Sequence, residues 1–561
     1  MKRFKSIKLS LILFRYCLII LLLRWVFLNL RKSVILEIDL FETSSLNFGF
    51  IIVLDKISVS FRIVVTLISG RVFLFAHKYI EEDPFKDRFI WILISFVISI
   101  NLLIFSGSLF FILLGWDGLG ITSFALIIYY QSDESLKAGF QTLIINRLGD
   151  VIIVLSTFLI VCRGQFSVFS IRNRVFYFSG IVGILCCAAL TKRAQFPFRS
   201  WLPAAIAAPT PVRALVHSST LVTAGIFLII RLRYNFPINE NITRILLFCG
   251  SVTCLLGGWA ATYENDIKKV IALSTLSQLG VIVFSLGLNL PSLALFHLYT
   301  HALFKALLFL AAGHILMITF GNQDIRLLGG VGLAMPLVST IFNIRRLCLV
   351  GAPFIRAFYS KHLILEKMFI RRINFFRIIL ILGATIMTAI YVSRTLKAIS
   401  WRKTVSPLLS GVSGVHRRLP VLLLGVGGII GGKLLRSIEI NNLELAFIPR
   451  GMGNFINIIT VTGIVLGLVV KGVPKSRFSL STLFFLTPLI YGSLKVFAPF
   501  KKRIGLLDYG WLEPYFFVKN KFYFRGSTLR EVSRWPNSRI FLSCLRFFYF
   551  LLIASIYRYQ N

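Results

Sequence analysis

Charged residues are scarce in this chain of 561 residues, and acidic residues are scarcer than basic ones. Asp, Glu, Lys and Arg make up 15% of the sequence, whereas a soluble globular domain carries about 25%. Hydrophobic residues make up 57%, and the mean hydropathy is +0.81. This composition excludes an ordinary soluble domain and predicts a membrane protein that crosses the bilayer many times.

Signatures of cofactor and metal sites are also missing. The eight cysteines show no Cys-x-x-Cys spacing, and Cys186 and Cys187 are adjacent. Neither arrangement suits a zinc site or an iron–sulfur cluster. The sequence has no glycine-rich phosphate-binding motif in a strand–helix setting. We therefore expect this chain to bind no cofactor and no metal ion of its own.

The formal net charge of +40 would ordinarily indicate binding to nucleic acid or to an anionic membrane surface. Here, however, the arginines are spread among apolar segments, which argues against a nucleic-acid partner. The first 30 residues resemble a signal peptide. Their apolar stretch is long and no small-residue cleavage site follows, so we expect a helix there.

Apolar runs long enough to cross a bilayer recur along the chain. A membrane-spanning helix needs about 20 such residues, and on this criterion we predict an all-α fold with about 16 transmembrane helices. The weaker spans include 419–437, 457–472 and 479–497. The predicted parts are N-terminal peripheral helices (1–85), two antiporter-like five-helix repeats (86–235 and 236–400), additional transmembrane helices (401–497), an amphipathic lateral helix (498–537) and an anchor helix (538–561).

The fourth span of each predicted repeat is interrupted. The first interruption lies at Gln195–Pro197 and the second at Gly351–Pro353, with Lys192 just before the first and Lys361 after the second. Proline ends a helix, and a broken helix in a bilayer needs a polar cavity around its freed backbone groups. Interruptions at corresponding positions are typical of transporters built from inverted repeats.

Three titratable residues follow one another at intervals of four in the segment LFHLYTHALFKALLFL. A helical repeat of about 3.6 residues places His297, His301 and Lys305 on one face. They are candidates for a proton-conducting ladder. Alternatively, the histidines donate to neighbouring carbonyls while the lysine reaches toward the membrane surface. A metal site is a third, weaker interpretation, because no carboxylate motif accompanies the histidines.

Two acidic residues lie inside predicted spans. Asp117 is the single acid of its span, and a lone carboxylate in a bilayer is costly unless it is paired. We predict that it pairs with Lys192 on a facing helix. Asp150 follows Arg147 by three residues, which is compatible with a local helical ion pair or with a role at a channel entrance.

His217 lies beyond the first interruption, in the segment ALVHSST. A lone buried histidine is usually a satisfied core residue. The closeness of Lys192 and of the hydroxyl residues at 218–220 in sequence is also compatible with a proton relay.

Several longer motifs occur in a fixed order, and together they resemble one known family. They are LLGWDGLGITSF, NRLGD, TKRAQFPFRSWLPAAIAAPTPVRALVHSST, NDIKKVIALSTLSQLG, THALFKALLF, QDIRLLGG and GAPFIRAFYSKHLILE. The chain is similar over about residues 85–400 to the mitochondrial NADH–ubiquinone oxidoreductase chain 5 family of respiratory complex I, in an arthropod-like form. Beyond that range the likeness fades to LDYGWLEPY near the end.

The resemblance implies an antiporter-like subunit in the mitochondrial inner membrane, with flavin, iron–sulfur clusters and ubiquinone held by other subunits. It also implies a lateral helix running along neighbouring antiporter-like subunits. By motif, Asp117 matches the carboxylate that pairs with the first broken-helix lysine, Lys192. His217 and Lys305 match the central relay, and Lys361 matches the second broken-helix lysine.

Two residues depart from the family pattern. The family usually has glutamate where this chain has Asp117, which is shorter by one methylene. The family usually has aspartate after its Tyr-Ser-Lys motif, where this chain has His362. A histidine can carry a proton near neutral pH, but a carboxylate partner for Lys361 is then missing or is supplied elsewhere.

Arginine stands at three positions where the family typically has serine, namely Arg193, Arg199 and Arg213. An arginine at the centre of a bilayer costs at least about 2.5–3.5 kcal/mol. Methionine is also scarce, at six residues. Invertebrate mitochondria read AGA and AGG as serine and ATA as methionine, so we hypothesise that some of these arginines are serines in the molecule.

Our first hypothesis for the function is a membrane-arm subunit of complex I. It would translocate protons along Asp117, Lys192, His217, His301, Lys305 and Lys361, coupled to electron transfer in other subunits. A cation/proton antiporter would share the repeats and the lysines, but would have no use for a lateral helix. If the chain were a purely structural component, replacement of Lys192 or Lys305 by alanine would leave pumping by the assembled complex intact. Membrane lipids are expected partners in every case.

Overall fold

The computed structural model describes most of the chain up to residue 403 and a few segments beyond it. The described residues are 5–30, 33–43, 46–162, 175–235, 238–352, 355–371, 373–403, 421–422, 425, 450–469, 492, 498–500 and 503. The chain divides into two units, Met1–Phe484 and Phe485–Asn561, and every element below belongs to the first. The predicted lateral and anchor helices lie almost wholly outside the described residues, as do most of the spans predicted at 419–437 and 479–497.

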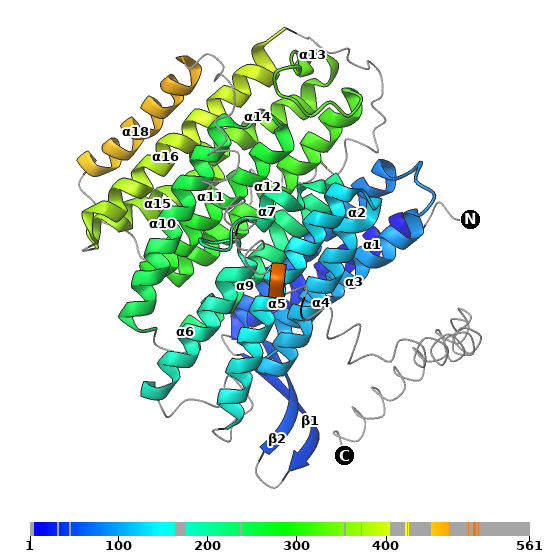
Figure 1. Cartoon of the computed structure of the whole chain (residues 1–561), viewed down its shortest axis with the longest axis vertical. Coiled ribbons are helices and arrows are strands. Elements are labelled where there is room, and N and C mark those ends of the chain that lie inside the picture. Colours follow the sequence, from blue (N-terminus) through cyan, green and yellow to red (C-terminus); the bar gives the residue numbers. More distant parts are fainter. Residues whose placement is uncertain are drawn as a thin grey trace. The chain divides into compact units, whose positions relative to one another are not determined.

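The first unit is a helical bundle with one β-hairpin (Figure 1). Within the described residues, ten helices are long and apolar enough to cross a membrane. The elements in chain order are α1 (Lys5–Leu30), β1 (Val34–Thr43), β2 (Leu46–Leu54), α2 (Lys56–Tyr79), α3 (Lys86–Phe105), α4 (Leu109–Ile127), η2 (Ile128–Tyr130), α5 (Asp133–Val161), α6 (Val175–Lys192), α7 (Trp201–Ala204), η3 (Ala205–Ala207), α8 (Thr210–Val212), η4 (Arg213–Thr220), α9 (Leu221–Asn235), α10 (Glu240–Tyr263), α11 (Ile267–Gly287), α12 (Pro291–Ile318), α13 (Val331–Ala334), α14 (Pro336–Val350), α15 (Arg356–Ile370), α16 (Phe375–Leu396), η5 (Lys397–Trp401) and α18 (Arg450–Val469).

Helix α2 begins at a reciprocal cap and lies inside the bundle. The Asp55 carboxylate accepts a hydrogen bond from the Ser58 backbone N–H at 3.0 Å, and the Ser58 hydroxyl accepts one from the Asp55 N–H at 3.0 Å. These two bonds satisfy backbone donors that the first helical turn leaves without partners. Helix α2 packs against α1, α12 and η4. It is therefore more deeply buried than the peripheral position expected for residues 1–85.

The β-hairpin was not predicted from the sequence. Strands β1 and β2 pair in antiparallel register from Val34–Leu54 to Thr43–Leu46, and Figure 1 shows them projecting beyond the ends of the neighbouring helices. The Gly107 N–H donates to the Ile51 carbonyl at 2.8 Å, which ties β2 to the turn between α3 and α4. β1 alternates apolar and acidic residues at Leu36–Leu40, a strand pattern that a search for long apolar runs does not detect.

The centre of the bundle is formed by α11, α12 and the segment of η4 and α9, and the apolar stretches of all three are almost wholly buried. A surface helix has one apolar face, whereas a helix buried on all sides is apolar around its circumference. The polar residues of α12 therefore stand out from an otherwise apolar environment. They are the residues that the remaining helices surround.

Both predicted helix interruptions are confirmed. Helix α6 ends at Lys192, and the next helical residue is Trp201. Helix α14 ends at Val350, where Gly351 has a φ of 92°, a left-handed conformation that glycine adopts without strain. Helix α15 then begins at Arg356. Each interruption thus places a lysine beside a helix end within the bundle.

Candidate functional site

One face of α12 carries three buried titratable residues, His297, His301 and Lys305, all of them 0% exposed. The Lys305 amine donates to the Ser274 hydroxyl at 2.5 Å and lies 3.5 Å from the Ile271 carbonyl oxygen, both on α11. The lysine therefore does not reach toward the membrane surface, as one interpretation of the sequence allowed. It is held in the centre of the bundle by neutral oxygen atoms.

The two histidines of this face leave ring nitrogens without hydrogen bonds. His297 Nδ1 lies 2.9 Å from the Ser360 hydroxyl on α15, while its Nε2 has no partner among the described residues. Both ring nitrogens of His301 are buried and likewise have no partner in that part of the chain. The bonds to neighbouring carbonyls that would make these histidines structural are not formed.

Lys361 lies on α15, beyond the second interruption, and is 3% exposed. Its amine donates to the Leu349 and Val350 carbonyls at 3.3 and 3.4 Å, at the end of α14, and to the Thr388 hydroxyl on α16 at 3.1 Å. The unpaired carbonyls of a helix C-terminus carry partial negative charge, which favours a cation there. The broken helix thus provides a binding place for the ammonium group.

Ser360 connects this lysine segment to the central helix. It immediately precedes Lys361, and its hydroxyl contacts His297 Nδ1 at 2.9 Å and the Thr300 hydroxyl at 3.4 Å. A hydroxyl group both donates and accepts. Ser360 can therefore pass a proton between α12 and α15.

His362, which stands where the resemblance leads us to expect an acid, is itself paired with one. Its Nδ1 lies 2.7 Å from Glu366 Oε1, one turn further along α15. A carboxylate is therefore present on the helix of Lys361, four residues after the position where the family usually has aspartate.

The predicted direct pair between Lys192 and Asp117 is wrong as a contact. The Lys192 amine donates to the backbone carbonyl of Trp116 at 2.5 Å and lies 4.1 Å from the centre of the Trp116 ring. The Asp117 carboxylate instead lies 3.5 Å from Arg147 on α5. The Lys192 amine therefore binds the backbone oxygen of Trp116, and not the side chain of Asp117 as expected.

Arg147 joins the two acids of this region. Its guanidinium lies 3.5 Å from Asp117 and 3.5 Å from Asp150, and the second contact is the local helical ion pair considered from the sequence. Lys192 reaches the same region through the carbonyl of Trp116, the residue before Asp117. Together these groups form a charged cluster on α4, α5 and the end of α6.

His217 is buried in η4, a π-helical segment of eight residues. Neither ring nitrogen has a partner among the described residues, and the ring centre lies 6.2 Å from that of Trp201. The neighbouring hydroxyls of Ser218, Ser219 and Thr220 donate to carbonyls of their own helix. Each of these hydroxyls can still accept a hydrogen bond, so they remain available to a relay through His217. Segments of π-helix are frequent at functional sites.

The three lysines share one chemical feature. Among the described residues, no carboxylate oxygen lies within 4.0 Å of the amines of Lys192, Lys305 or Lys361. A buried ammonium that is not directly paired is costly, so a buried lysine can change its charge when neighbouring charges move. The arrangement is suited to moving protons rather than to binding a fixed ligand.

The residues that hold the lysine amines and the acid beside His362 were not predicted from the sequence. Ser274 and Thr388 lie on helices adjacent to the lysines, and no sequence spacing identifies them. Glu366 could have been found, because it follows His362 by four residues, the spacing of neighbours on a helix face.

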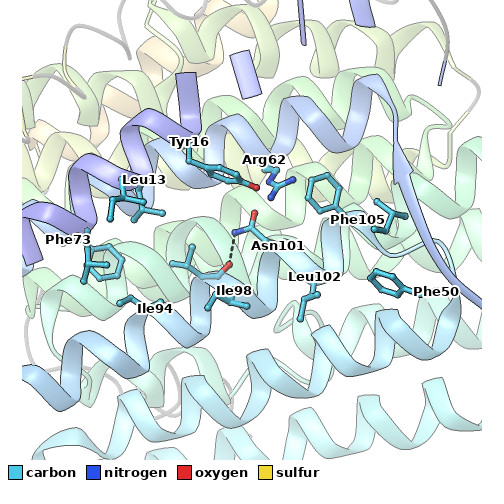
Figure 2. Close-up of a pocket in the computed structure, with 14 residues that line it drawn as sticks. Leu13, Tyr16, Phe50, Arg62, Phe73, Ile94, Ile98, Asn101, Leu102 and Phe105 are labelled. Carbon is cyan, nitrogen blue, oxygen red and sulfur yellow. Dashed lines mark hydrogen bonds between the residues drawn. The ribbon is translucent and has the colours of Figure 1, made fainter. Parts of the chain in front are cut away.

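A separate cavity of about 550 Å³ lies between α1, α2, α3 and β2 (Figure 2). Most of its lining is apolar. Its polar groups gather where Figure 2 shows Tyr16, Arg62 and Asn101 close together. The Arg62 guanidinium lies 3.6 Å from the centre of the Phe105 ring and 4.5 Å from that of Tyr16. No residue of the lysine and histidine series lines this cavity.

Comparison with known sequences points to one family. A family model described as "NADH:quinone oxidoreductase/Mrp antiporter, TM" matches residues 106–388, and one described as "NADH-Ubiquinone oxidoreductase (complex I), chain 5 N-terminus" matches residues 40–90. The NADH-ubiquinone oxidoreductase chain 5 of Aedes aegypti is 38% identical over 505 residues, which is 89% of this chain and 86% of that protein. The protein of the same name from Lumbricus terrestris is 41% identical over 424 residues, or 75% of this chain and 73% of that protein.

Two solved structures share the fold. A chain of the Mrp complex from Dietzia sp. DQ12-45-1b superposes with a TM-score of 0.71 at 21% identity, covering 99% of this chain and 60% of that chain. A chain of the membrane-bound sulfane sulfur reductase, an archaeal respiratory membrane complex, superposes with a TM-score of 0.67 at 21% identity, covering 83% of this chain and 93% of that chain. At this identity the likeness extends to the fold alone.

Proposed function

This chain belongs to the NADH–ubiquinone oxidoreductase chain 5 family, and from that premise we propose how it moves protons. It is a membrane-arm subunit of complex I, the proton-translocating NADH:ubiquinone oxidoreductase. We propose that its protons pass along the lysine and histidine series in the centre of the bundle. Electron transfer takes place in other subunits, which hold the flavin, the iron–sulfur clusters and ubiquinone.

The observation that carries this proposal is the face of α12. His297, His301 and Lys305 are fully buried there, in one row, and three of the four histidine ring nitrogens have no partner among the described residues. Buried polar groups that are merely structural are nearly always hydrogen-bonded. Ionisable side chains inside a membrane-spanning helix are rare, and those without hydrogen-bond partners indicate a functional site.

The proposed route runs from the first interruption to the second. A proton enters at the cluster of Asp117, Asp150 and Arg147 and reaches Lys192. From there it passes through His217 to Lys305 and along the face of α12. The Ser360 hydroxyl, which contacts the His297 ring at 2.9 Å, then leads toward Lys361, the next residue of α15. Water is needed wherever the residues are not in direct contact.

The wider architecture follows from the same family. We propose that residues 86–235 and 236–400 are inverted repeats, and that residues 498–537 form a lateral helix along neighbouring antiporter-like subunits. The membrane is then the mitochondrial inner membrane. Other membrane-arm subunits of complex I are its partners, and the apolar cavity in Figure 2, which lies among membrane helices, is suited to the hydrocarbon chain of a lipid.

Replacement of the central lysine tests the proposal. We expect Lys305→Ala complex, assembled and reconstituted in vesicles, to oxidise NADH with fewer protons translocated per NADH than the unmodified complex. Lys137→Ala provides the control, because Lys137 is exposed on α5 and lies outside the series. Both complexes are compared at equal NADH oxidation rates, with proton uptake followed by a pH-sensitive dye.

An unchanged proton yield in assembled Lys305→Ala complex would contradict the proposed function and favour a purely structural role. Proton movement that requires a sodium gradient, without NADH, would instead indicate a cation/proton antiporter.

A further inference from the structure

His362 and Glu366 form a hydrogen-bonded pair on α15, with 2.7 Å between Nδ1 and Oε1. A carboxylate only accepts hydrogen bonds, so in a neutral ring Nδ1 carries the proton and Nε2 carries a lone pair. Nε2 is buried and has no hydrogen-bond partner in the part of the chain that the structure describes. The imidazole thus has one nitrogen bound to an acid and the other ready to accept a proton.

The pair is more exposed than Lys361, the residue that directly precedes His362 on α15. Lys361 is 3% exposed, whereas the side chains of His362 and Glu366 are 13% and 19% exposed. Glu366 lies about 7.5 Å further along the helix axis than Lys361, at about 1.5 Å per residue, and α15 ends at Ile370. The next residue, Arg371, is exposed. Exposure therefore increases from Lys361 through His362 to Glu366, in the direction of the C-terminal end of α15.

The surroundings of the pair leave the carboxylate accessible and shield the ring. The Phe358 ring lies against His362, tilted by 36° with 4.6 Å between ring centres. Gly453 on α18 lies near Glu366, because a Cβ added there would lie 3.9 Å from Glu366 Oε1. No side chain at this position covers the acid.

We propose that Glu366 is a proton-carrying residue of this chain and that His362 transfers protons between Lys361 and Glu366. This inference rests on the proposed function, because it supplies the outer end of the same route. Glu366 is the one acid within α15. It takes the place of an acid directly after Lys361, which this chain lacks.

The transfer is balanced within the three residues. The Lys361 ammonium releases a proton, which His362 Nε2 accepts directly or through a water molecule. The imidazole then releases its Nδ1 proton to the Glu366 carboxylate. Lysine and glutamic acid end neutral, and the ring ends neutral with its proton on Nε2. Glu366 then releases its proton, the ring returns to its first tautomer, and Lys361 takes up a new proton from the inner part of the route, which completes the cycle.

Three variants in the assembled complex test this. We expect Glu366→Gln to lower the proton yield per NADH to that of Lys361→Ala. His362→Gln keeps an amide that can donate to Glu366 but cannot relay a proton, so it should lower the yield equally while thermal stability is retained. In the Glu366→Gln background, His362→Asp places a carboxylate next to Lys361 and should restore the yield.

Glu240→Gln is the matched control, because Glu240 forms an i,i+4 pair with Arg244 at 3.0 Å on the exposed surface of α10. The inference is overturned if Glu366→Gln and His362→Gln both pump as the control does, since a pair that only stabilises α15 would give that result. Suppose that these two variants pump normally but Lys305→Ala abolishes pumping in the same assay. The inference about Glu366 and His362 is then wrong, whereas the proposed function stands.

Discussion

At the scale of single residues, what distinguishes the three membrane lysines is the neutral oxygen atoms that hold them. Lys192 binds a backbone carbonyl, Lys305 a serine hydroxyl, and Lys361 two carbonyls and a threonine hydroxyl. Neutral acceptors stabilise an ammonium less than a carboxylate does. Each lysine is therefore held firmly enough to stay in place and weakly enough to give up its proton.

Removal of the hydroxyl beside Lys305 should slow pumping. In Ser274→Ala complex the amine keeps only the Ile271 carbonyl at 3.5 Å. A hydrogen bond to a charged group contributes about 1.5–3 kcal/mol, so we expect the pumping rate to fall roughly tenfold or more. Ser285→Ala is the control, since the Ser285 hydroxyl bonds a carbonyl of its own helix. Equal pumping rates in the two variants would show that Ser274 does not support Lys305.

The buried arginines lead to a prediction about the chemical identity of the residues. Arg193 is 0% exposed, and none of its three guanidinium nitrogens has a partner among the described residues. Two guanidinium nitrogens of Arg213 are likewise buried without a hydrogen-bond partner among the described residues. Unpaired buried donors of this kind are costly, and serine would remove them. We expect mass spectrometry of peptides from the purified protein to show serine at 193 and 213, and an arginine mass at either position would refute this for that residue.

The side-chain partners in the first half of the site could not be predicted from sequence. The motif placed Asp117 and Lys192 in one region, which the structure bears out. Which atom the lysine binds depends on the rotation of α4 about its axis, and this rotation brings the Trp116 carbonyl rather than the Asp117 carboxylate to the amine. Sequence spacing describes which residues share a helix face, but not how two faces meet.

At the scale of elements, hydropathy predicted the helices well and the strands not at all. Long apolar segments predicted a bundle of long helices, because the bilayer sets their length. Proline and glycine predicted both interruptions, whereas α15 was not predicted as a separate helix. The hairpin at 34–54 does carry a strand pattern, because apolar and acidic residues alternate from Leu36 to Leu40. A search for long apolar runs does not detect this alternation. The span predicted at 457–472 corresponds to α18 (Arg450–Val469), shifted toward the N-terminus.

The contact between α10 and α11 depends on glycine. A Cβ at Gly280 would lie 2.7 Å from the Cys254 backbone nitrogen and 2.8 Å from the Gly250 carbonyl oxygen. Because these neighbours are backbone atoms, the helices themselves must separate. We expect Gly280→Val to cost about 1–3 kcal/mol or more of stability, measured as a lower thermal unfolding temperature and a smaller yield of assembled complex.

Gly120→Ala on α4 is the matched control, because nothing lies within 4 Å of a Cβ there. Alanine in a helix interior is favoured over glycine by up to about 1 kcal/mol, so this variant should be neutral or slightly stabilising. A Gly280→Val complex as stable as the Gly120→Ala complex would mean that the two helices do not pack as closely as the structure has them.

At the scale of the whole molecule, the site is a series that connects two broken helices through one continuous helix. Lys192 stands at the end of α6, Lys305 in the middle of α12, and Lys361 on α15 beyond the second interruption. If the three lysines belong to a single route, the loss of any one of them stops the same proton. If they belong to separate half-routes that each deliver a proton, the losses in proton yield from two replacements add.

A double variant separates these two cases. For one route, Lys192→Ala, Lys361→Ala and the double variant should all give the same reduced proton yield per NADH, because residues that act as a unit are not additive. For two routes, the double variant should lose the sum of the two single losses. The measurement is proton uptake by reconstituted vesicles at matched NADH oxidation rates. An additive result would place the division of the route between Lys192 and Lys361, and His217 and the α12 face would then be tested next as its two possible boundaries.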